Sequence, residues 1–183
     1  MTIYEALETD HRKVKQLLIR LVGITDKNAS ERHDLISQIR DELIPHARAE
    51  ESIFYNSMRE LESGNEEVMH GYKEHMEAET LLRMLQVRDK IDMEWKKTAQ
   101  QLKDALEHHI QEEESKIFSV ARRLFTEEEA RMMGQAFEKL KMEVKDEGFM
   151  KTTVDLVTNL MPPRLTSLFK SKGSKSQSIG RTA

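Results

Sequence analysis

The chain has 183 residues, enough for one domain with a sizeable core and an additional segment. It contains no cysteine, which excludes disulfides, thiolate metal sites and cysteine nucleophiles. The net charge of −4 is unevenly spread, because 164–183 holds five of the 29 basic residues and none of the 33 acidic ones. The rest carries 24 basic against 33 acidic residues, which argues against nucleic acid as a partner.

No apolar run approaches the length that spans a membrane, and the N-terminus lacks a basic region followed by an apolar one. We therefore expect a cytoplasmic protein that has no membrane partner. The sequence leaves its oligomeric state open.

The apolar residues repeat with a period near 3.6, and only seven glycines and three prolines interrupt them, so we predict an all-α fold. The first helix begins at the capping-box pattern Thr2-x-x-Glu5 and the second at Ser30, a candidate N-cap. A third helix over about 65–87 and a fourth over about 93–124 follow. Four such helices joined by short loops predict an up-down-up-down four-helix bundle.

A second capping-box pattern, Thr126-x-x-Glu129, predicts a helix over about 127–147, and one more short helix is expected from Phe149 to Met161. The remainder is rich in Ser, Lys and Gly, which is typical of disorder. The predicted organisation is a bundle over 1–125, a C-terminal helical extension over 126–161, and a flexible basic tail over 162–183.

A short motif occurs twice: His46-x-x-x-Glu50 followed by Glu-Ser recurs 63 residues later as His109-x-x-x-Glu113 followed by Glu-Ser. Residues four apart lie on the same face of a helix, so each pair points the same way. One further histidine precedes each copy on the apolar stripe of another helix. Burying six polar side chains would cost several kcal/mol each in lost solvation, unless they bind a common metal centre. We predict a two-metal site whose ligands are His11, His46, Glu50, His75, His109 and Glu113.

Three other residues are candidates for the same pocket. Glu79 lies four residues after His75 on the inward series, so it is an additional ligand, a carboxylate that supports a ligand, or an ion-pair partner of a lysine. Tyr4 shares a face with His11, whereas Tyr55 is poorly aligned with His46 on an ideal helix, and both tyrosines also suit plain packing.

The other histidines and the neighbouring glutamates are interpreted as residues that do not bind the metal. His108 and Glu112 are expected to form a solvated surface pair, because His108 is rotated about 100° from its neighbour His109. We interpret His33 and His70 as surface residues too. Glu51 and Glu114 are expected either to support the ligands or to face solvent.

The six-residue pattern, with an apolar-aromatic pair after each Glu-Glu, resembles the hemerythrin-like (HHE cation-binding) domain over about 1–125. The resemblance implies a four-helix bundle with two non-haem iron ions, bridged by an oxo or hydroxo group and by the two carboxylates. Oxygen-carrying hemerythrins have another histidine where this chain has Glu79, and an Asp five residues after the last histidine, where this chain has Glu113 four residues on. The departures argue against reversible oxygen transport.

Two octahedral iron ions have about twelve coordination positions. After the four histidines, the two bridging carboxylates and the bridging oxygen, two positions stay open, or one if Glu79 also binds. We therefore expect the centre to bind or react with a small oxidant (O2, NO or H2O2) in sensing or in defence against oxidative or nitrosative stress. One alternative is a di-iron enzyme with peroxidase-like, catalase-like or NO-consuming activity. Another is a structural bundle that a metal such as zinc merely staples together.

Overall fold

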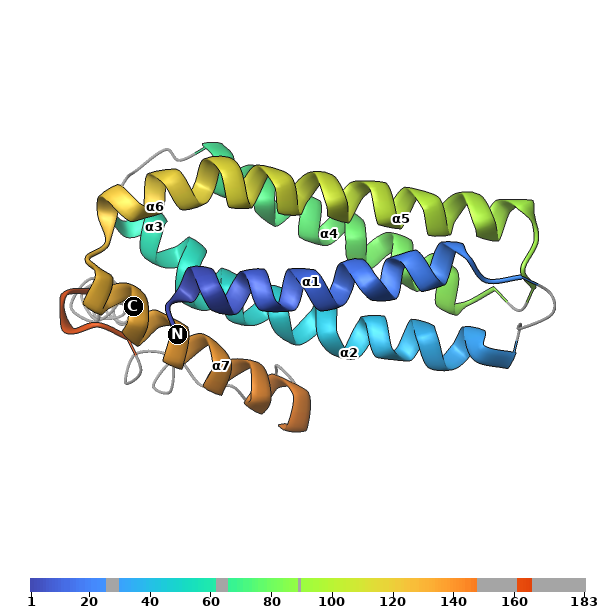
Figure 1. Ribbon diagram of the computed structural model, residues 1–183, viewed down its shortest axis with the longest axis horizontal. Helices are drawn as coiled ribbons and strands as arrows, with labels where there is room; N and C mark the ends of the chain where they lie inside the picture. Colours follow the sequence, from blue (N-terminus) through green and yellow to red (C-terminus); the bar gives the residue numbers. More distant parts are fainter. Residues whose placement is uncertain (26–29, 62–65, 89, 148–160, 166–183) are drawn as a thin grey trace, which may run out of the picture.

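The computed structural model describes residues 1–25, 30–61, 66–88, 90–147 and 161–165, and the described residues are helical without a strand. The helical segments are α1 (Ile3–Val22); α2 (Arg32–Glu50) continued by η2 (Glu51–Tyr55) and α3 (Asn56–Leu61); α4 (Glu66–Gln86); α5 (Met93–Glu112) continued by η3 (Glu113–Ile117) and α6 (Phe118–Leu124); and α7 (Glu127–Glu147). In the described ranges, α1, α2, α4 and α5 with their continuations form four long helical segments, which run side by side along the molecule with α7 lying against them (Figure 1). The prediction of an all-α up-down-up-down bundle is confirmed.

The helix starts follow local capping chemistry. At α1, the Thr2 backbone N–H donates to Glu5 Oε2 at 2.7 Å and the Glu5 N–H donates back to Thr2 Oγ1 at 3.4 Å. The predicted capping box ahead of α7 forms in the same way. The N-cap expected at Ser30 is wrong, because α2 begins at Arg32 after an uncapped Glu31. The helix expected from Phe149 lies largely outside the described residues.

Two of the long helices contain a π-helical turn, η2 and η3, next to a candidate ligand. In η2 the Asn56 N–H donates to the Glu51 carbonyl, and in η3 the Phe118 N–H donates to the Glu113 carbonyl. Residues five apart share a face in such a turn, whereas residues four apart share one in an α-helix. The π turns therefore change which side chains follow each ligand into the bundle.

The apolar core forms two clusters. One, with Leu7 and Phe54, lies where α1, η2, α6 and α7 meet, and the other, with Leu18 and Leu102, fills the far half of the bundle. The candidate ligands come between these clusters along their helices, as His11 does between Leu7 and Val14. Met161, at the end of the predicted extension, and Leu165, near the start of the predicted tail, also pack in the first cluster, and the tail from 166 onward lies outside the described residues. A polar layer is thus enclosed by apolar side chains on both sides.

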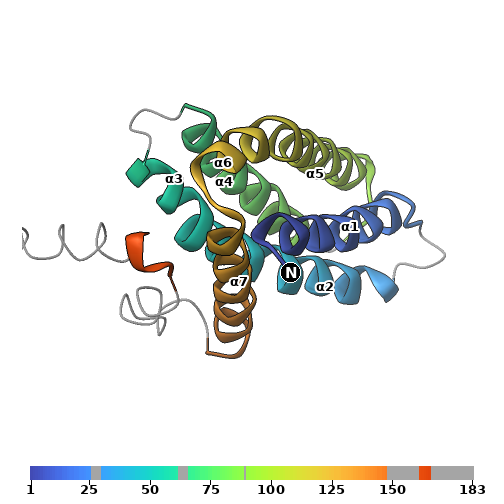
Figure 2. The ribbon, with the colours of Figure 1, turned by 60° about the vertical axis from the view of Figure 1, so that its left-hand side comes forward.

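Helix α7 crosses the ends of α1 and α2 (Figure 2). Its Gly134 lies against the start of the chain, since a Cβ there would be 2.7 Å from the Met1 carbonyl oxygen. Phe137 of α7 packs edge-on against His46, with ring centres 5.6 Å apart. The C-terminal extension therefore covers one side of the polar layer.

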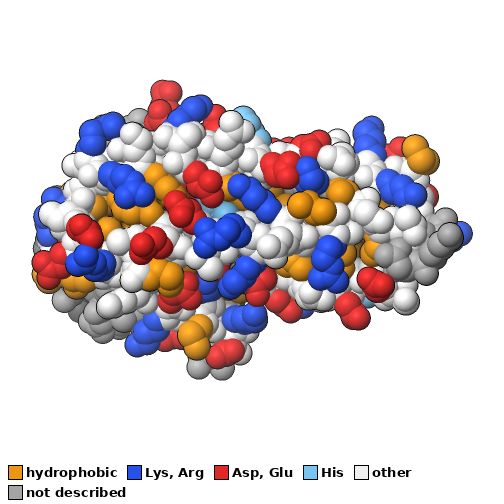
Figure 3. Space-filling view, viewed as in Figure 1, with side chains coloured by type: hydrophobic (Ala, Val, Ile, Leu, Met, Phe, Trp, Pro, Cys, Tyr) orange, Lys and Arg blue, Asp and Glu red, His pale blue; other side chains and the backbone are white. Residues whose placement is uncertain are grey.

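The outer surface mixes charges of both signs. On the face drawn in Figure 3, acidic and basic side chains are interspersed, and apolar side chains are scattered among them. Within the described ranges, no helix combines the length and apolarity needed to cross a bilayer.

Candidate metal centre

The bundle brings all six predicted ligands into one buried layer. They come from α1, α2, α4, α5 and the first residue of η3, so every long helix of the bundle contributes. The exposed fraction of each is at most 4%. The residues are His11, His46, Glu50, His75, His109 and Glu113.

The Nε2 atoms of the four imidazoles face the two carboxylates or one another. Glu50 Oε2 lies 3.3 Å from the Nε2 atoms of both His46 and His75. The Nε2 atoms of His75 and His109 are 3.1 Å apart, close to the ~3.0 Å between neighbouring ligands on one metal ion with bonds of about 2.1 Å. Glu50, His75 and His109 thereby offer three ligand atoms within 4.8 Å of one another.

The other two histidines form a second pair. His11 Nε2 lies 3.1 Å from Glu113 Oε2, and the rings of His11 and His46 have their centres 5.2 Å apart. With Glu50 next to His46 and Glu113 next to His11, each carboxylate has an imidazole of this pair beside it. A second set of imidazole and carboxylate donor atoms therefore lies beside the group of Glu50, His75 and His109.

A carboxylate binds the outer nitrogen of each imidazole. Every Nδ1 is within hydrogen-bond distance of an Asp or Glu oxygen, which fixes the ring and favours the tautomer whose Nε2 lone pair points inward. The four pairs are His11 Nδ1 with Glu114 Oε1 at 2.8 Å, His46 Nδ1 with Asp10 Oδ2 at 3.2 Å, His75 Nδ1 with Glu51 Oε1 at 2.9 Å, and His109 Nδ1 with Glu74 Oε2 at 2.9 Å.

These four bonds follow the internal repeat of the sequence. The acidic residue that precedes the first histidine of each half binds the second histidine of the same half. The acidic residue that follows the ligand carboxylate binds the first histidine of the other half. The first rule gives Asp10 with His46 and Glu74 with His109, and the second gives Glu51 with His75 and Glu114 with His11.

Several inward atoms are buried and unsatisfied. Both carboxylate oxygens of Glu50, both of Glu113, and His11 Nε2 lack a hydrogen-bond partner among the described residues. An unsatisfied buried carboxylate costs free energy that a bound cation offsets. The donor set therefore fits cations held between the imidazoles and the two carboxylates.

The two carboxylates affect each other's ionisation. Burial, together with the negative charge of Glu50, raises the pKa of Glu113 well above its ordinary value of 4.5. Burial also acts to raise the pKa of Glu50, but Glu113 and the imidazoles of His46 and His75 outweigh it and hold that pKa well below 4.5. The second carboxyl of the pair is therefore harder to ionise than the first, and a cation that binds both favours the ionised form of each.

The histidine pKa values diverge in the same field. Burial lowers the pKa of His75, but Glu50 and Glu51 outweigh burial and raise that pKa to about 9. Burial lowers the pKa of His11 to about 4 despite Glu114. The metal-free layer consequently holds charged and neutral imidazoles side by side, and ligands must be neutral imidazoles to bind a metal.

Tyr55 lies against this layer. Its ring stacks on His75, with centres 5.7 Å apart and planes 10° from parallel, and its buried hydroxyl has no hydrogen-bond partner among the described residues. Burial and the charges of Glu113 and Glu50 raise its pKa well above 10.0. Tyr55 is five residues after Glu50, so the π turn places it on the ligand face, as an unbroken α-helix would not.

Gly71 of α4 leaves the space that the Tyr55 ring occupies. A Cβ at Gly71 would be 2.6 Å from Tyr55 Oη and 2.8 Å from Cε2. We expect Gly71→Ala to displace the tyrosine from His75 and to lower the free energy of unfolding by about 1–2 kcal/mol, despite the better helix propensity of alanine. Urea unfolding measures the change, and Tyr55→Phe should restore part of the loss.

Gly23→Ala is the matched control for this substitution, because the nearest atom to a Cβ at Gly23 is 3.4 Å away. It should leave the stability unchanged or slightly higher. If Gly71→Ala behaves as Gly23→Ala does, the Tyr55 ring is not confined as described.

The other two candidates lie away from the ligand atoms. Tyr4 packs edge-on against Phe54 and Phe118 with the Arg122 guanidinium over its ring, and burial raises its pKa to about 12. Glu79 pairs through Oε1 with Nη2 of Arg48. Arg48 also pairs with Glu51, so Glu79 is two side chains removed from His75.

The structure adds residues that sequence reasoning did not single out. Asp10 and Glu74 support His46 and His109, and each directly precedes a ligand histidine in the sequence, a regularity that could have revealed them. Lys141 of α7 donates to Asp10 Oδ2 at 2.7 Å and to Oδ1 at 3.0 Å. No local sequence pattern predicts the contact between Lys141 and Asp10, because it depends on how α7 packs against the bundle.

A helical bundle whose core is a layer of imidazoles and carboxylates defines a cation-binding protein. Residues 2–121 match the hemerythrin HHE cation binding domain, and the chain belongs to this family. It is also 27% identical over 145 residues to a protein of Nostoc sp. called DNA nickase. That match covers 79% of this chain and 40% of the Nostoc protein. No solved structure matches the chain.

Proposed function

We propose that the six buried residues hold two iron ions and that this centre binds or reacts with O2, NO or H2O2. The observation that carries the proposal is the set of unsatisfied carboxylate oxygens on Glu50 and Glu113, beside imidazoles whose Nδ1 atoms are already bonded. Sensing of such an oxidant, or defence against it, is the physiological role that follows.

The donor set favours iron over a structural metal. Imidazole and carboxylate ligands suit iron and zinc alike, but a closed structural zinc site needs only four ligands. Six ligands over two ions leave positions open, and bound iron would supply redox chemistry at those positions. A zinc-stapled bundle remains the alternative that the metal analysis below decides.

The space beside the imidazoles suits a very small ligand. A cavity of about 10 Å³ adjoins all four ring systems. This is room for one water-sized molecule. Its other walls are apolar: Val14, Leu43, Leu106 and Ile110. Such walls exclude bulk water and suit a very small neutral molecule.

The proposal is tested by purifying the protein from iron-supplemented cells and measuring its metal content and visible absorption. We expect about two irons per chain, an absorption spectrum that NO or H2O2 changes, and loss of both properties in His46→Ala. His33→Ala is the matched control, because His33 is exposed and its Nε2 contacts Arg32. One zinc per chain, or full iron content with no response to either oxidant, would contradict the proposal.

Repeated additions of H2O2 or NO to the same iron-loaded protein distinguish binding from turnover. Repeated additions of H2O2 or NO that are each consumed, with the spectrum returning every time, indicate the peroxidase-like, catalase-like or NO-consuming enzyme. A stoichiometric spectral change without consumption indicates a sensor or binding module.

The buried centre does not suit cleavage of DNA, the activity in the name of the Nostoc relative. The candidate ligands are at most 4% exposed, so a phosphodiester backbone could not reach them. Charges of both signs are interspersed on the face drawn in Figure 3, which offers no continuous basic surface there. Incubation of the iron-loaded protein with supercoiled plasmid tests this, and we expect the plasmid to stay supercoiled. Conversion to the nicked form would show that the protein cleaves DNA.

A further inference from the structure

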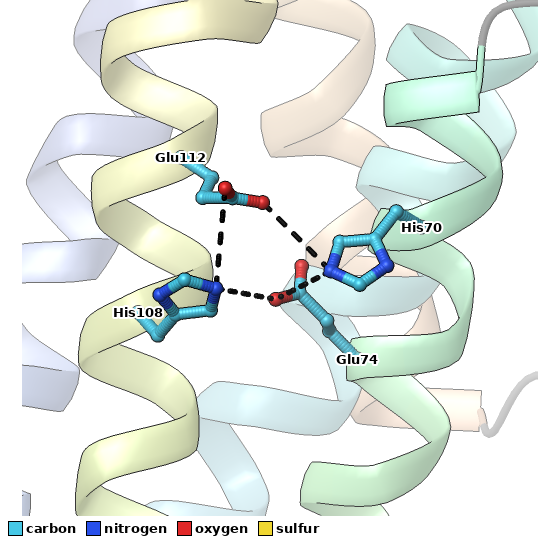
Figure 4. A group of neighbouring side chains, drawn as sticks. All are labelled: His70, Glu74, His108 and Glu112. Carbon is cyan, nitrogen blue, oxygen red and sulfur yellow. Dashed lines mark ion pairs between the residues drawn. The ribbon is translucent and has the colours of Figure 1, made fainter.

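A second group of histidines and carboxylates lies on the outside of the bundle. His70 and Glu74 come from α4, and His108 and Glu112 come from α5, and the four side chains point toward one another (Figure 4). Each helix contributes a His-x-x-x-Glu pair. The sequence analysis places His70, His108 and Glu112 on the surface of their own helices, and only the packing of α4 against α5 brings them together with Glu74 as one cluster.

The distances within the cluster approach those of a tetrahedral metal site. His70 Nε2 lies 3.4 Å from Glu74 Oε1 and 3.8 Å from Glu112 Oε2. His108 Nε2 lies 3.9 Å from Glu74 Oε1 and from Glu112 Oε1. Ligand atoms about 2.0–2.2 Å from a tetrahedral zinc ion are about 3.3–3.6 Å from one another. Side-chain rotations that draw the four ligand atoms together from their present separations of at most 4.8 Å would complete such a site.

An isolated exposed His–Glu pair needs no explanation beyond surface electrostatics. Here, however, each imidazole faces a carboxylate from its own helix and one from the neighbouring helix. All four ligand atoms lie within 4.8 Å of one another. The imidazoles are 53% and 61% exposed, so an ion can enter directly from solvent.

Glu74 belongs to this cluster and also to the buried layer. Its Oε2 accepts the hydrogen bond from His109 Nδ1, while its Oε1 faces the two surface imidazoles. This bond holds the Glu74 carboxylate at the mouth of the cluster. The side chain is only 12% exposed, which limits the conformations it can adopt.

We propose that His70, Glu74, His108 and Glu112 form a second, surface site for a divalent cation of the zinc class. The shared Glu74 carboxylate couples this site to the buried centre. A cation on Oε1 withdraws electron density from the carboxylate, so Oε2 becomes a weaker acceptor for His109. Occupancy of the surface site therefore alters the donor strength of one buried imidazole, and this coupling rests on the proposed function of the buried centre.

The binding test uses the purified full chain and Zn²⁺ alone, titrated by calorimetry after the metal content has been measured. We expect one zinc site that His70→Ala or His108→Ala weakens at least tenfold and that the double variant lacks. His33→Ala should bind as the unaltered protein does. Equal stoichiometry and affinity in the double variant, or zinc uptake matched by release of iron, would overturn the proposal.

Lys116 provides a substitution that acts in the opposite direction. Its Nζ pairs with Glu112 Oε1 from one turn further along the chain and is 60% exposed. A cation at the cluster must displace this ammonium group, so Lys116→Ala should tighten zinc binding several-fold. Unchanged affinity in this variant would contradict the assignment of Glu112 as a ligand.

The coupling has a separate readout. Zinc added to the iron-loaded protein should shift the visible absorption of the buried centre, and it should leave the His70→Ala/His108→Ala spectrum unchanged. An unshifted spectrum at saturating zinc overturns the coupling through Glu74. The loss of one zinc site in the His70→Ala/His108→Ala variant does not depend on which metal the buried centre holds, so failure of the iron proposal and failure of the surface site give different outcomes.

Discussion

Replacing Glu113 by glutamine is expected to stabilise the metal-free protein and, at the same time, to lower the metal that the protein retains. Glu113 is fully buried, none of its oxygens has a hydrogen-bond partner among the described residues, and Glu50 adds a nearby negative charge. Glutamine has nearly the same shape without the charge, so we expect about 1–3 kcal/mol of added stability without metal. Urea unfolding after chelation measures this gain, and elemental analysis before chelation measures the loss of iron.

The stability gain should depend on pH in a defined direction. Because the folded-state pKa of Glu113 is raised above 4.5, the metal-free protein gains stability as the pH falls from neutral toward 4.5. Glu113→Gln lacks this contribution, so its advantage shrinks over the same range. Glu107→Gln on α5, where the glutamate is 39% exposed and pairs with Lys103, should change neither property. A metal-free Glu113→Gln protein less stable than the unaltered chain would contradict the charge argument.

Asp10→Asn is expected to weaken both the metal centre and the docking of α7. The Asp10 carboxylate is 2% exposed and lies between His46 Nδ1 and Lys141 Nζ. Removing its charge leaves the Lys141 ammonium group with Glu138 Oε1, 3.0 Å away, as its counter-ion, and the lost charged hydrogen bond costs about 1.5–3 kcal/mol. It also weakens the bond that orients His46, which typically costs 10–100-fold in metal affinity. Metal competition assays and urea unfolding measure the two losses.

The acid dependence of this effect follows from the pKa of Asp10. Burial acts to raise that pKa, but His46 and Lys141 outweigh it and hold the pKa well below 3.8. The stabilisation is therefore present above about pH 3.8 and is lost as the pH falls further, so the variant and the unaltered protein converge in acid. Lys141→Met is the comparison variant, since it removes the contact with α7 and keeps Asp10 beside His46. Equal metal loss in the two variants would contradict a direct role of Asp10 in orienting His46.

The sequence carries enough information to predict the bundle, because apolar spacing and capping residues act locally. The boundaries of α7 illustrate this, since the predicted range of about 127–147 is the observed Glu127–Glu147. That His11, His46, Glu50, His75, His109 and Glu113 would share one layer followed from the repeated motif. Their ligand roles stay a prediction, which the metal analysis tests.

Two features could not be predicted, for different physical reasons. The π turns are absent from the ideal 3.6-residue geometry used to align Tyr55, so the helical projection placed this residue away from the ligands. The cluster around His70 depends on how two helices are rotated against each other. Neither helix alone indicates that rotation, because each pair looks like a solvated i, i+4 contact.

The bonds between Glu51 and His75, and between Glu114 and His11, join the two halves of the bundle to each other. Neither helical hairpin contains all the carboxylates that its own histidines use, so a single hairpin would be incomplete. Two identical hairpins around a twofold axis would satisfy every such bond, because in a twofold arrangement each half supplies the other with the same contact. The symmetry is now broken, since the position of Tyr55 in one half is taken by Phe118 in the other. The two halves of the centre are therefore chemically inequivalent, with the Tyr55 phenol stacked on His75 in one half and, at the equivalent position of the other, Phe118 packed against Tyr4 and Phe54.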